Sequence, residues 1–318
     1  MSNAAIRMEQ LILPTYPEPG KEEMPLFSEH RVHQRSTGRP YPNKVTLEVN
    51  RERKIERSYT VVHLENEFLD VLVLPEIGGR IFAARDKVTG YDFFYCQHVI
   101  KPGLIGALGS WISGGVEFNW PYHHRPSGFL PCDFETEECG DGSVICWLSE
   151  HDPIDRMKGM VGIVLKPGCA YLETRVKLCN RTPVTKSFLW WENAAVPVNE
   201  SYQIFFPKDV TYVNFHYLDS RISYPVAGDA TFNGIDMTTP RDISWHKNTK
   251  DATSYFACAS RYDFFGGYDH GLGCGVVHIG DHHISPGKKM FTWAYNQLSK
   301  TWENTLTDTD GQYAELMA

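Results

Sequence analysis

Residues 132–150 read "CDFETEECGDGSVICWLSE" and decide the class of fold. Polar and apolar side chains alternate on both sides of a Gly-Asp-Gly turn at 140–142. Alternation with a period of two indicates strands that bury one face, and glycine beside aspartate favours a tight turn. The stretch therefore predicts an antiparallel hairpin. Residues 160–182, "MVGIVLKPGCAYLETRVKLCNRT", repeat the scheme around a Pro-Gly turn.

Short strand patterns of the same kind occupy most of the remaining chain. From residue 45 onward, β-branched and aromatic runs end at Gly, Pro, Asn or Asp, for example "YTVVHLEN" at 59–66 and "LDVLVLPEIGG" at 69–79. We find no convincing amphipathic helix of twelve or more residues. Many short strands with frequent turns predict an all-β fold, a large antiparallel β-sandwich with few short helices.

The ends of the chain suggest its domain organisation. Residues 1–43 are rich in Pro, Glu and Arg and lack periodicity, so we interpret them as an extended N-terminal arm. Residues 44–318 are predicted to form one β-sandwich domain. The chain stops at "YAELMA", within a predicted strand at 313–318. We therefore expect a sandwich truncated at its C-terminus, as the N-terminal portion of a longer protein.

Composition narrows the classes of function. With 42% hydrophobic and 22% charged residues, the 318-residue chain has the balance of a folded globule. Its net charge of −8 argues against a nucleic-acid partner, since phosphate binding needs a clustered basic face. No run of eighteen apolar residues predicts a membrane span. The eight cysteines form no CxxC pair and no apolar leader opens the chain, which favours reduced thiols and a cytoplasmic location.

Residues 114–126, "GGVEFNWPYHHRP", concentrate polar and aromatic chemistry. Strand alternation puts Glu117 and Asn119 on one face, where a carboxylate and an amide suit hydrogen bonds to vicinal hydroxyls. Pro121 ends the strand and leaves the following residues in a loop, where binding groups are common. The alternative is that Glu117 pairs with a nearby arginine and the loop histidines are solvent-exposed. The other candidates in this stretch are Trp120, His123, His124 and Arg125.

Four further residues carry candidate chemistry. Arg80 follows a double glycine in "PEIGGRI" and serves either a structural ion pair or a hydroxylated or anionic ligand. Glu315 lies between apolar neighbours, where a raised pKa would suit acid–base work, or it is a solubilising charge on an edge strand. In "SFLWWENAAV" at 187–196, Glu192 and Asn193 are interpreted as polar groups on one face.

Residues 281–289, "DHHISPGKK", contain adjacent histidines. On a strand they face opposite sides, so both bind one metal ion only if the backbone turns. Histidines at strand spacing are more often hydrogen-bonding residues. The sequence therefore predicts no metal and no cofactor. It also lacks GxSxG, Walker A, HExxH, and GxGxxG after a strand.

Seven motifs in order resemble one bacterial family, a domain of unknown function often joined to tetratricopeptide repeats and belonging to the galactose mutarotase-like superfamily. The resemblance runs from about residue 10 to the last residue, and the motifs are "LPEIGGRIFAARDKVTGYDFFY", "VIKPGLIGALGSWISGGVEFNWPYHHRP", "DRMKGM", "NRTPVTKSFLWWENAAV", "SYFACASRYDFFGGYDHG", "DHHISPGKK" and "LTDTDGQYAELM". The resemblance implies a β-supersandwich and a tetratricopeptide-repeat region as a partner in a longer protein.

The resemblance also implies roles for single residues. In aldose 1-epimerases of that superfamily a late-strand Glu acts as base at the anomeric hydroxyl, so Glu315 is the implied base. Histidines protonate the ring oxygen or hold the sugar, which implies that role for His124, with His123. Where mutarotases carry Asn followed by a catalytic His, this chain has Asn193 followed by Ala194. That departure argues against simple mutarotation.

Together these observations predict a carbohydrate-active protein that acts at the anomeric centre of a pyranoside. Glycoside cleavage or transfer would use Glu117 and Glu315 as the two carboxylates, with His124 as a third catalytic residue. Two alternatives stay open: an aldose 1-epimerase-like activity, and a non-catalytic carbohydrate-binding module. The predicted residues for binding a sugar or oligosaccharide are Arg80, Trp111, Asn119, Trp120, His123, Arg125, Trp191, Glu192, Asn193 and His283.

Overall fold

The computed structural model describes residues 3–18, 51–104, 110–121, 124–125, 127–153, 155–215, 221–228, 231–232, 235–236, 238–250 and 252–318. These residues fall into two compact units. The first unit comprises Met1–Asp92, Cys96–Trp191 and Thr305–Thr307. The second comprises Phe93–Tyr95, Glu192–Asn304 and Asp308–Ala318.

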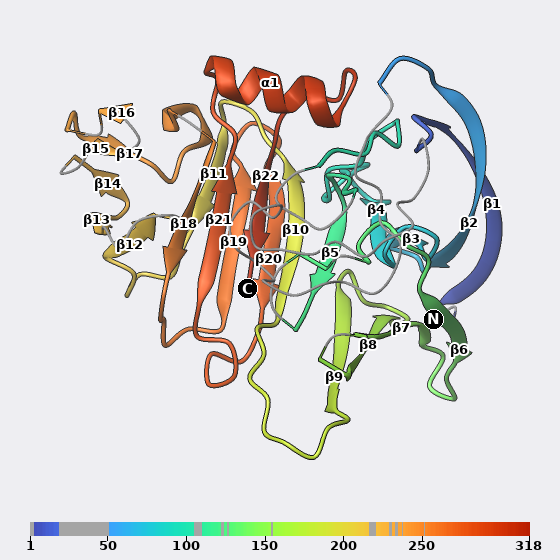
Figure 1. Ribbon diagram of the computed structural model, residues 1–318. Coiled ribbons are helices and arrows are strands. Elements are labelled where there is room, and N and C mark those ends of the chain that lie inside the picture. Colours follow the sequence, from blue (N-terminus) through green and yellow to red (C-terminus); the bar gives the residue numbers. More distant parts are fainter. Residues whose placement is uncertain are drawn as a thin grey trace. The chain divides into compact units, whose positions relative to one another are not determined.

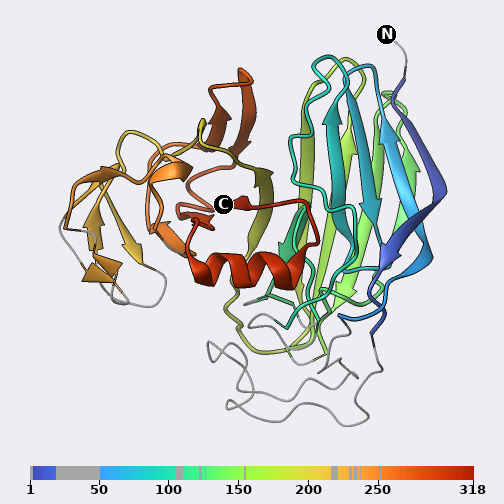
Figure 2. The ribbon, with the colours of Figure 1, turned by 90° about the horizontal axis from the view of Figure 1, so that it is seen from above.

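The first unit is a sandwich of two antiparallel sheets (Figures 1 and 2). In one sheet the strands of this unit follow the order β1 (Ala5–Thr15), β2 (Ile55–Glu65), β3 (Leu69–Leu74), β4 (Arg80–Asp86) and β5 (Val116–Asn119). The four-stranded sheet has the order β6 (Asp133–Glu138), β7 (Val144–His151), β8 (Met157–Leu165) and β9 (Leu172–Asn180). Their facing side chains bury each other between the layers, as in other sandwiches.

Both predicted hairpins are present in the four-stranded sheet. β6 pairs with β7 around the Gly-Asp-Gly turn, which is closed by a bond from the Cys139 N–H to the Ser143 carbonyl at 2.8 Å. β8 pairs with β9 around Pro167-Gly168. The alternation also holds, because Cys146 and Ile163 face each other in register and are fully buried.

The N-terminal stretch differs from the prediction of an extended arm. Ala5–Thr15 forms β1 and pairs along its whole length with β2. Leu11 and Leu13 pack on the core of this unit, which gives the strand a buried face despite the polar residues around them. The rest of the predicted arm, residues 19–43, and its boundary at 44 lie outside the described residues.

The second unit contains a longer sheet and several smaller ones (Figure 1). Its strands in the longer sheet follow the order β10 (Trp191–Pro197), β22 (Tyr313–Met317), β21 (Lys288–Thr292), β18 (Thr253–Ala257), β12 (Tyr212–Phe215) and β13 (Arg221–Ser223). The first residue of β10, Trp191, belongs to the first unit. A three-stranded sheet has the order β11 (Tyr202–Phe205), β19 (Phe264–Asp269) and β20 (Cys274–Ile279). Two short pairs are β14 (Val226–Ala227) with β17 (Arg241–Asp242), and β15 (Thr231–Phe232) with β16 (Ile235–Asp236).

The core of the second unit lies between the longer sheet and the three-stranded sheet. Val213, Met290 and Leu316 from the longer sheet pack with Ile204 and Phe265 from the other. Successive side chains of a strand point to opposite faces, so the other face of the longer sheet carries a different set of residues.

Helices are few among the described residues. They are one 3₁₀ turn, η3 (His246–Asn248), and one α-helix, α1 (Gln297–Leu306), at whose start the Asn296 side-chain oxygen accepts the Ser299 N–H at 2.9 Å. The predicted all-β class with large antiparallel sheets and few helices is confirmed. None of the helices in the described ranges has the length and apolar character that crossing a membrane requires.

Candidate functional site

The chain enters β5 through a double glycine. Gly114 and Gly115 have φ of 93° and 64°, in the left-handed region that glycine tolerates. A Cβ on Gly115 would lie 1.9 Å from the Ile81 carbonyl oxygen. The missing side chain lets β5 approach β4, where Ile81 pairs with Val116, and so fixes the position of Glu117.

Arg80 holds the segment before this turn. Its Nη1 donates to the carbonyl oxygens of Ile112 and Gly114, each at 2.9 Å, and the side chain is almost fully buried. The guanidinium is thus engaged with backbone carbonyls, which suits the structural alternative better than ligand binding. Its charge still lies near enough to Glu117 to favour the ionised carboxylate.

Glu117 and His124 form the centre of the candidate site. The Nδ1 atom of His124 lies 3.1 and 3.2 Å from the two carboxylate oxygens of Glu117. Glu117 is 3% exposed, while 21% of the His124 side chain is exposed. A carboxylate only accepts hydrogen bonds, so Nδ1 carries the proton, and a neutral imidazole then has its lone pair on Nε2. The pair joins a buried carboxylate to a more accessible imidazole.

The carboxylate of Glu117 stays ionised despite its burial. Burial alone would raise its pKa, but the charge and hydrogen bond of His124 and the charge of Arg80 outweigh that effect. The result is a pKa well below the usual range of a glutamate. The Trp111 indole N–H contributes in the same direction without forming a full hydrogen bond. At neutral pH Glu117 therefore has no proton to donate.

Two indole rings flank the imidazole. The ring centre of His124 lies 5.7 Å from that of Trp111 and 4.8 Å from that of Trp191, both edge-on at 76° and 80°. Trp111 is buried, and Trp191 is partly exposed. Flat apolar rings beside a polar group are the surface on which a sugar ring stacks. The predicted residues Glu117, His124, Trp111 and Trp191 are thus brought together in the first unit.

Asn119 shares the strand face of Glu117, as alternation predicts. Its side-chain oxygen accepts the backbone N–H of Arg125 at 3.1 Å, which ties the loop to β5. Its amide nitrogen is buried and has no hydrogen-bond partner among the described residues. Because Asn119 is fully buried, its visible effect is to position the loop that carries His124.

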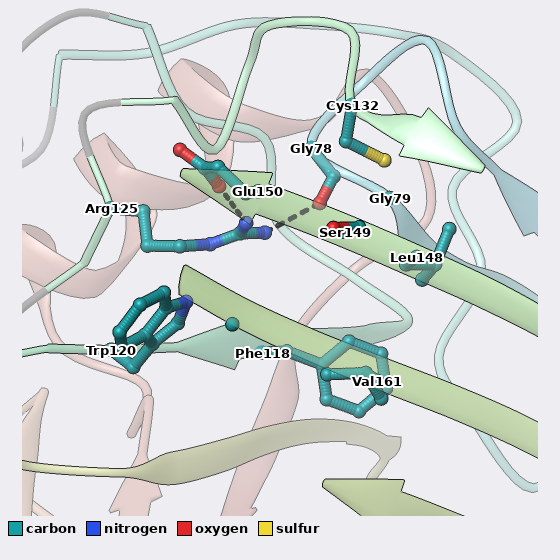
Figure 3. A pocket seen from close by; sticks show the side chains of 11 residues that line it. Gly78, Gly79, Phe118, Trp120, Arg125, Cys132, Leu148, Ser149, Glu150 and Val161 are labelled. Atoms are coloured by element: carbon teal, nitrogen blue, oxygen red, sulfur yellow. Dashed lines mark hydrogen bonds and ion pairs between the residues drawn. The ribbon is translucent and has the colours of Figure 1, made fainter. Parts of the chain in front are cut away.

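Trp120 and the Arg125 side chain lie in a small cavity on the other side of β5 (Figure 3). The Arg125 guanidinium forms an ion pair with Glu150 and donates to the Gly78 carbonyl at 2.5 Å. The Trp120 indole packs against Gly159 of β8. The cavity measures about 20 Å³, enough for a water molecule but not for a sugar. These contacts support structural roles for two residues that were predicted to bind substrate.

Glu315 lies in the second unit on an interior strand. β22 pairs with β10 on one side and β21 on the other, which excludes the edge-strand alternative. Ala314 and Leu316 point into the core, so Glu315 lies on the opposite face, in register with Ala195 and Phe291. It is largely buried there.

The interpretation that Glu192 and Asn193 share a face is wrong. They are neighbours on β10, and neighbouring side chains on a strand point to opposite faces. Asn193 is paired with Met317 and lies on the face of Glu315. The carboxylate of Glu192 instead lies 3.8 Å from Nε2 of His278 on β20, a residue that no sequence pattern singled out.

Two predicted histidines remain. His123 lies outside the described residues. His283 lies in the second unit, 78% of its side chain is exposed, and its Nδ1 is 2.9 Å from Asp281. Glu150, the partner of Arg125, was missed by sequence reasoning because nothing in a strand-end glutamate signals an ion pair 25 positions away.

The profile of one protein family matches residues 37–318, described as Domain of unknown function (DUF5107). The chain belongs to this family. The predicted membership of a family of unknown function is confirmed, and its description assigns no activity.

Among solved structures, the chain is similar to a TPR-domain containing protein from Parabacteroides distasonis ATCC 8503, with 22% identity and a TM-score of 0.81. The match covers 99% of this chain and 50% of that one, so the chain spans half of that protein's length and shares its fold there. It is also similar to a putative aldose 1-epimerase from Escherichia coli K12, with 11% identity, a TM-score of 0.47, and coverage of 80% and 86% of the two chains. That TM-score is too low to support a further conclusion.

Proposed function

We propose that this chain is a carbohydrate-active protein of mutarotase-like fold that acts at the anomeric centre of a pyranoside, with His124 as the proton-transfer residue. The observation that carries the proposal is the contact of 3.1 Å between His124 Nδ1 and Glu117. While the Nδ1–H group donates a hydrogen bond to the carboxylate, Nε2 accepts a proton from a sugar oxygen or, when it is protonated, returns one. Trp111 and Trp191 stack against the ring.

The state of Glu117 distinguishes between the predicted mechanisms. Glycoside cleavage by two carboxylates needs one of them protonated at working pH, with a raised pKa. The pKa of Glu117 is lowered instead, and its two oxygens contact His124. This environment supports a positioning role: Glu117 orients His124 and balances the imidazolium charge. In the proposed reaction, His124 therefore takes the place of Glu117 as the acid.

Turnover on sugars tests this proposal. Pure anomers of common aldoses would be followed by NMR, and a panel of aryl pyranosides and oligosaccharides by release of aryl alcohol or reducing ends. We expect acceleration on one of these substrates, reduced roughly 10²–10⁴-fold in His124→Gln, the usual contribution of a general acid or base. His151→Gln is the matched control, because His151 is an exposed histidine on β7 of the same unit. Full activity in His124→Gln would contradict the assignment.

The two reaction classes give different products. Anomer exchange without release of a second sugar indicates an epimerase-like reaction, and new reducing ends indicate glycoside cleavage. Sugar binding without any turnover, weakened by Trp191→Ala, would instead support the binding-module alternative. Glu315 remains a predicted catalytic base, and Glu315→Gln tests it separately because it belongs to the second unit.

The proposal also covers the neighbouring domains and the cellular location of the protein. Its similarity to half of a TPR-domain containing protein supports the predicted tetratricopeptide-repeat region as a partner within a longer protein. A cytoplasmic location is also proposed, since all eight cysteines are free thiols, the state that a reducing compartment maintains.

A further inference from the structure

Two carboxylates and two histidines gather where the β19–β20 hairpin of the second unit opens. Asp263 immediately precedes β19, and Asp281, His282 and His283 follow β20 after a single glycine. The Gly280 N–H donates to the Asp263 carbonyl at 2.8 Å and holds the two chain segments together. None of these residues belongs to the sugar site proposed above.

The backbone turns directly after the hairpin. The Ile284 N–H donates to the Asp281 carbonyl at 3.0 Å, and the His283 N–H donates to the Asp281 side chain at 2.9 Å. The turn brings the imidazole centres of His282 and His283 to 3.9 Å from each other. A straight strand would send these side chains to opposite faces, so the turn meets the condition that two adjacent histidines need to bind one ion.

Each imidazole lies beside a carboxylate. His282 Nδ1 lies 2.8 Å from Asp263 Oδ1, and His283 Nδ1 lies 2.9 Å from Asp281 Oδ1. Asp263 accepts from the Nδ1–H of His282, which leaves the lone pair of that neutral imidazole on Nε2. The Nδ1 atom of His283 and the Oδ1 atom of Asp281 are instead close enough to bind the same ion. Metal-binding histidines commonly have the arrangement of His282, in which a carboxylate fixes the tautomer and the ring orientation.

We propose that Asp281, His282 and His283 bind one divalent transition-metal ion, with Asp263 orienting His282. One ligand atom from each of the three residues lies within 4.8 Å of the others, close enough for a common ion. Two imidazoles with a carboxylate suit Zn²⁺, Ni²⁺ or Cu²⁺, whereas Mg²⁺ and Ca²⁺ prefer oxygen alone. Three protein ligands leave the remaining coordination positions to water, as in open zinc sites.

Neighbouring charges set the expected affinity. The carboxylates of Asp263 and Asp281 face the two imidazoles and favour a bound cation. The ammonium of Lys288 lies near Asp263 and adds an opposing positive charge. His283 and both aspartates are well exposed, so water competes for the ion. We therefore expect micromolar rather than nanomolar binding.

Titration of the full chain with NiCl₂ tests the site, because Ni²⁺ favours imidazole and binds the free thiols less strongly than Zn²⁺ does. Isothermal calorimetry should give one saturable ion per chain, and thermal unfolding should show a higher Tm with Ni²⁺. The double variant His282→Ala, His283→Ala should lose both effects, and His151→Ala, which removes an exposed histidine elsewhere, should keep them. Absence of saturable binding, or equal binding by the double variant, would overturn the proposal.

A second variant tests the carboxylate ligand. Asp281→Asn keeps an oxygen that accepts the His283 N–H and so preserves the turn, but it removes the negative charge. We expect the Kd for Ni²⁺ to rise at least ten-fold while the Tm without metal is unchanged. An unaltered Kd would show that Asp281 is not a ligand and would overturn the proposed ligand set.

Discussion

Glu117 and His124 depend on each other for their burial. A carboxylate that is 3% exposed is costly unless a cation or strong donors accompany it. His124 and Arg80 supply that compensation, and the pKa of Glu117 ends below its ordinary value rather than above it. The same interaction fixes the tautomer of His124. One pair thus provides both the stability of β5 and the orientation of the proposed proton-transfer group.

The pair predicts a pH-dependent stability. The folded-state pKa of Glu117 is depressed. Its contribution to the free energy of unfolding is therefore fully present above the unfolded-state pKa of about 4.3 and is lost as the pH falls toward the folded-state pKa. Glu117→Gln should therefore destabilise the protein most at neutral pH, and the difference from wild type should shrink below about pH 4. Urea unfolding of both proteins between neutral and acidic pH measures it. A difference that grows on acidification would contradict the depressed pKa.

Arg80 offers a second test at the scale of one residue. Both bonds to carbonyl oxygens come from Nη1 of a buried guanidinium, and lysine would place a compact, more strongly hydrated ammonium in that buried position. Arg80→Lys should cost about 2 kcal/mol or more of unfolding free energy, the scale of bonds from a charged group. Arg85→Lys, on the exposed face of β4, should cost under about 1 kcal/mol. Equal effects in the two variants would refute the structural role of Arg80.

The sequence predicted which faces these residues occupy but not which partners they have. Alternation along β5 correctly separated Glu117 and Asn119 from Phe118 and Trp120, because it depends only on the geometry of one strand. The partner of Arg125 is Glu150, on another sheet, and that contact depends on how the two sheets pack. The turn after Asp281 was likewise not predicted from the sequence, because it depends on hydrogen bonds rather than on composition.

At the scale of elements, hairpins were predicted best. The β6–β7 and β8–β9 hairpins combine alternation with a turn signal that lies between the two strands, so all the information is local. β1 was missed because its partner β2 begins some forty residues after it ends, and because its exposed face includes Met8 and Ile12, which obscure the alternation. A strand whose partner is distant in sequence has no adjacent turn signal to identify it.

The contact of Trp120, the residue after β5, with β8 can be tested by adding a single methyl group. A Cβ on Gly159 would lie 2.3 Å from the Trp120 indole, which is itself buried. Gly159→Ala should therefore force the indole or the strand to move, at a cost of about 1–3 kcal/mol typical of overpacking. Gly140→Ala is the matched control at the β6–β7 turn, where a Cβ meets no atom within 4 Å. Urea unfolding that ranks the two variants in the opposite order would refute this packing.

At the scale of the whole molecule, the chain contributes to each unit from more than one stretch. The first unit includes Thr305–Thr307, and the buried ammonium of Lys101 donates to the Thr307 carbonyl at 2.9 Å. The second unit includes Phe93–Tyr95. The two units are therefore compact in space but interrupted in sequence, which explains why no composition shift or linker marked a boundary between them.

This arrangement predicts that the second unit does not fold without residues 93–95. In the second unit the Tyr95 N–H donates to the Ala195 carbonyl at 2.9 Å, its hydroxyl donates to Gly311 at 2.8 Å, and its buried ring packs on Tyr313. A fragment of residues 192–318 lacks all three contacts and should show no cooperative thermal transition and weak near-UV circular dichroism. In the full chain, Tyr95→Ala should cost about 3–5 kcal/mol, as for other buried aromatic rings. The milder Tyr95→Phe keeps the ring contact and should cost about 1 kcal/mol for the lost hydrogen bond. A fragment that unfolds cooperatively would show instead that the second unit is complete without residues 93–95.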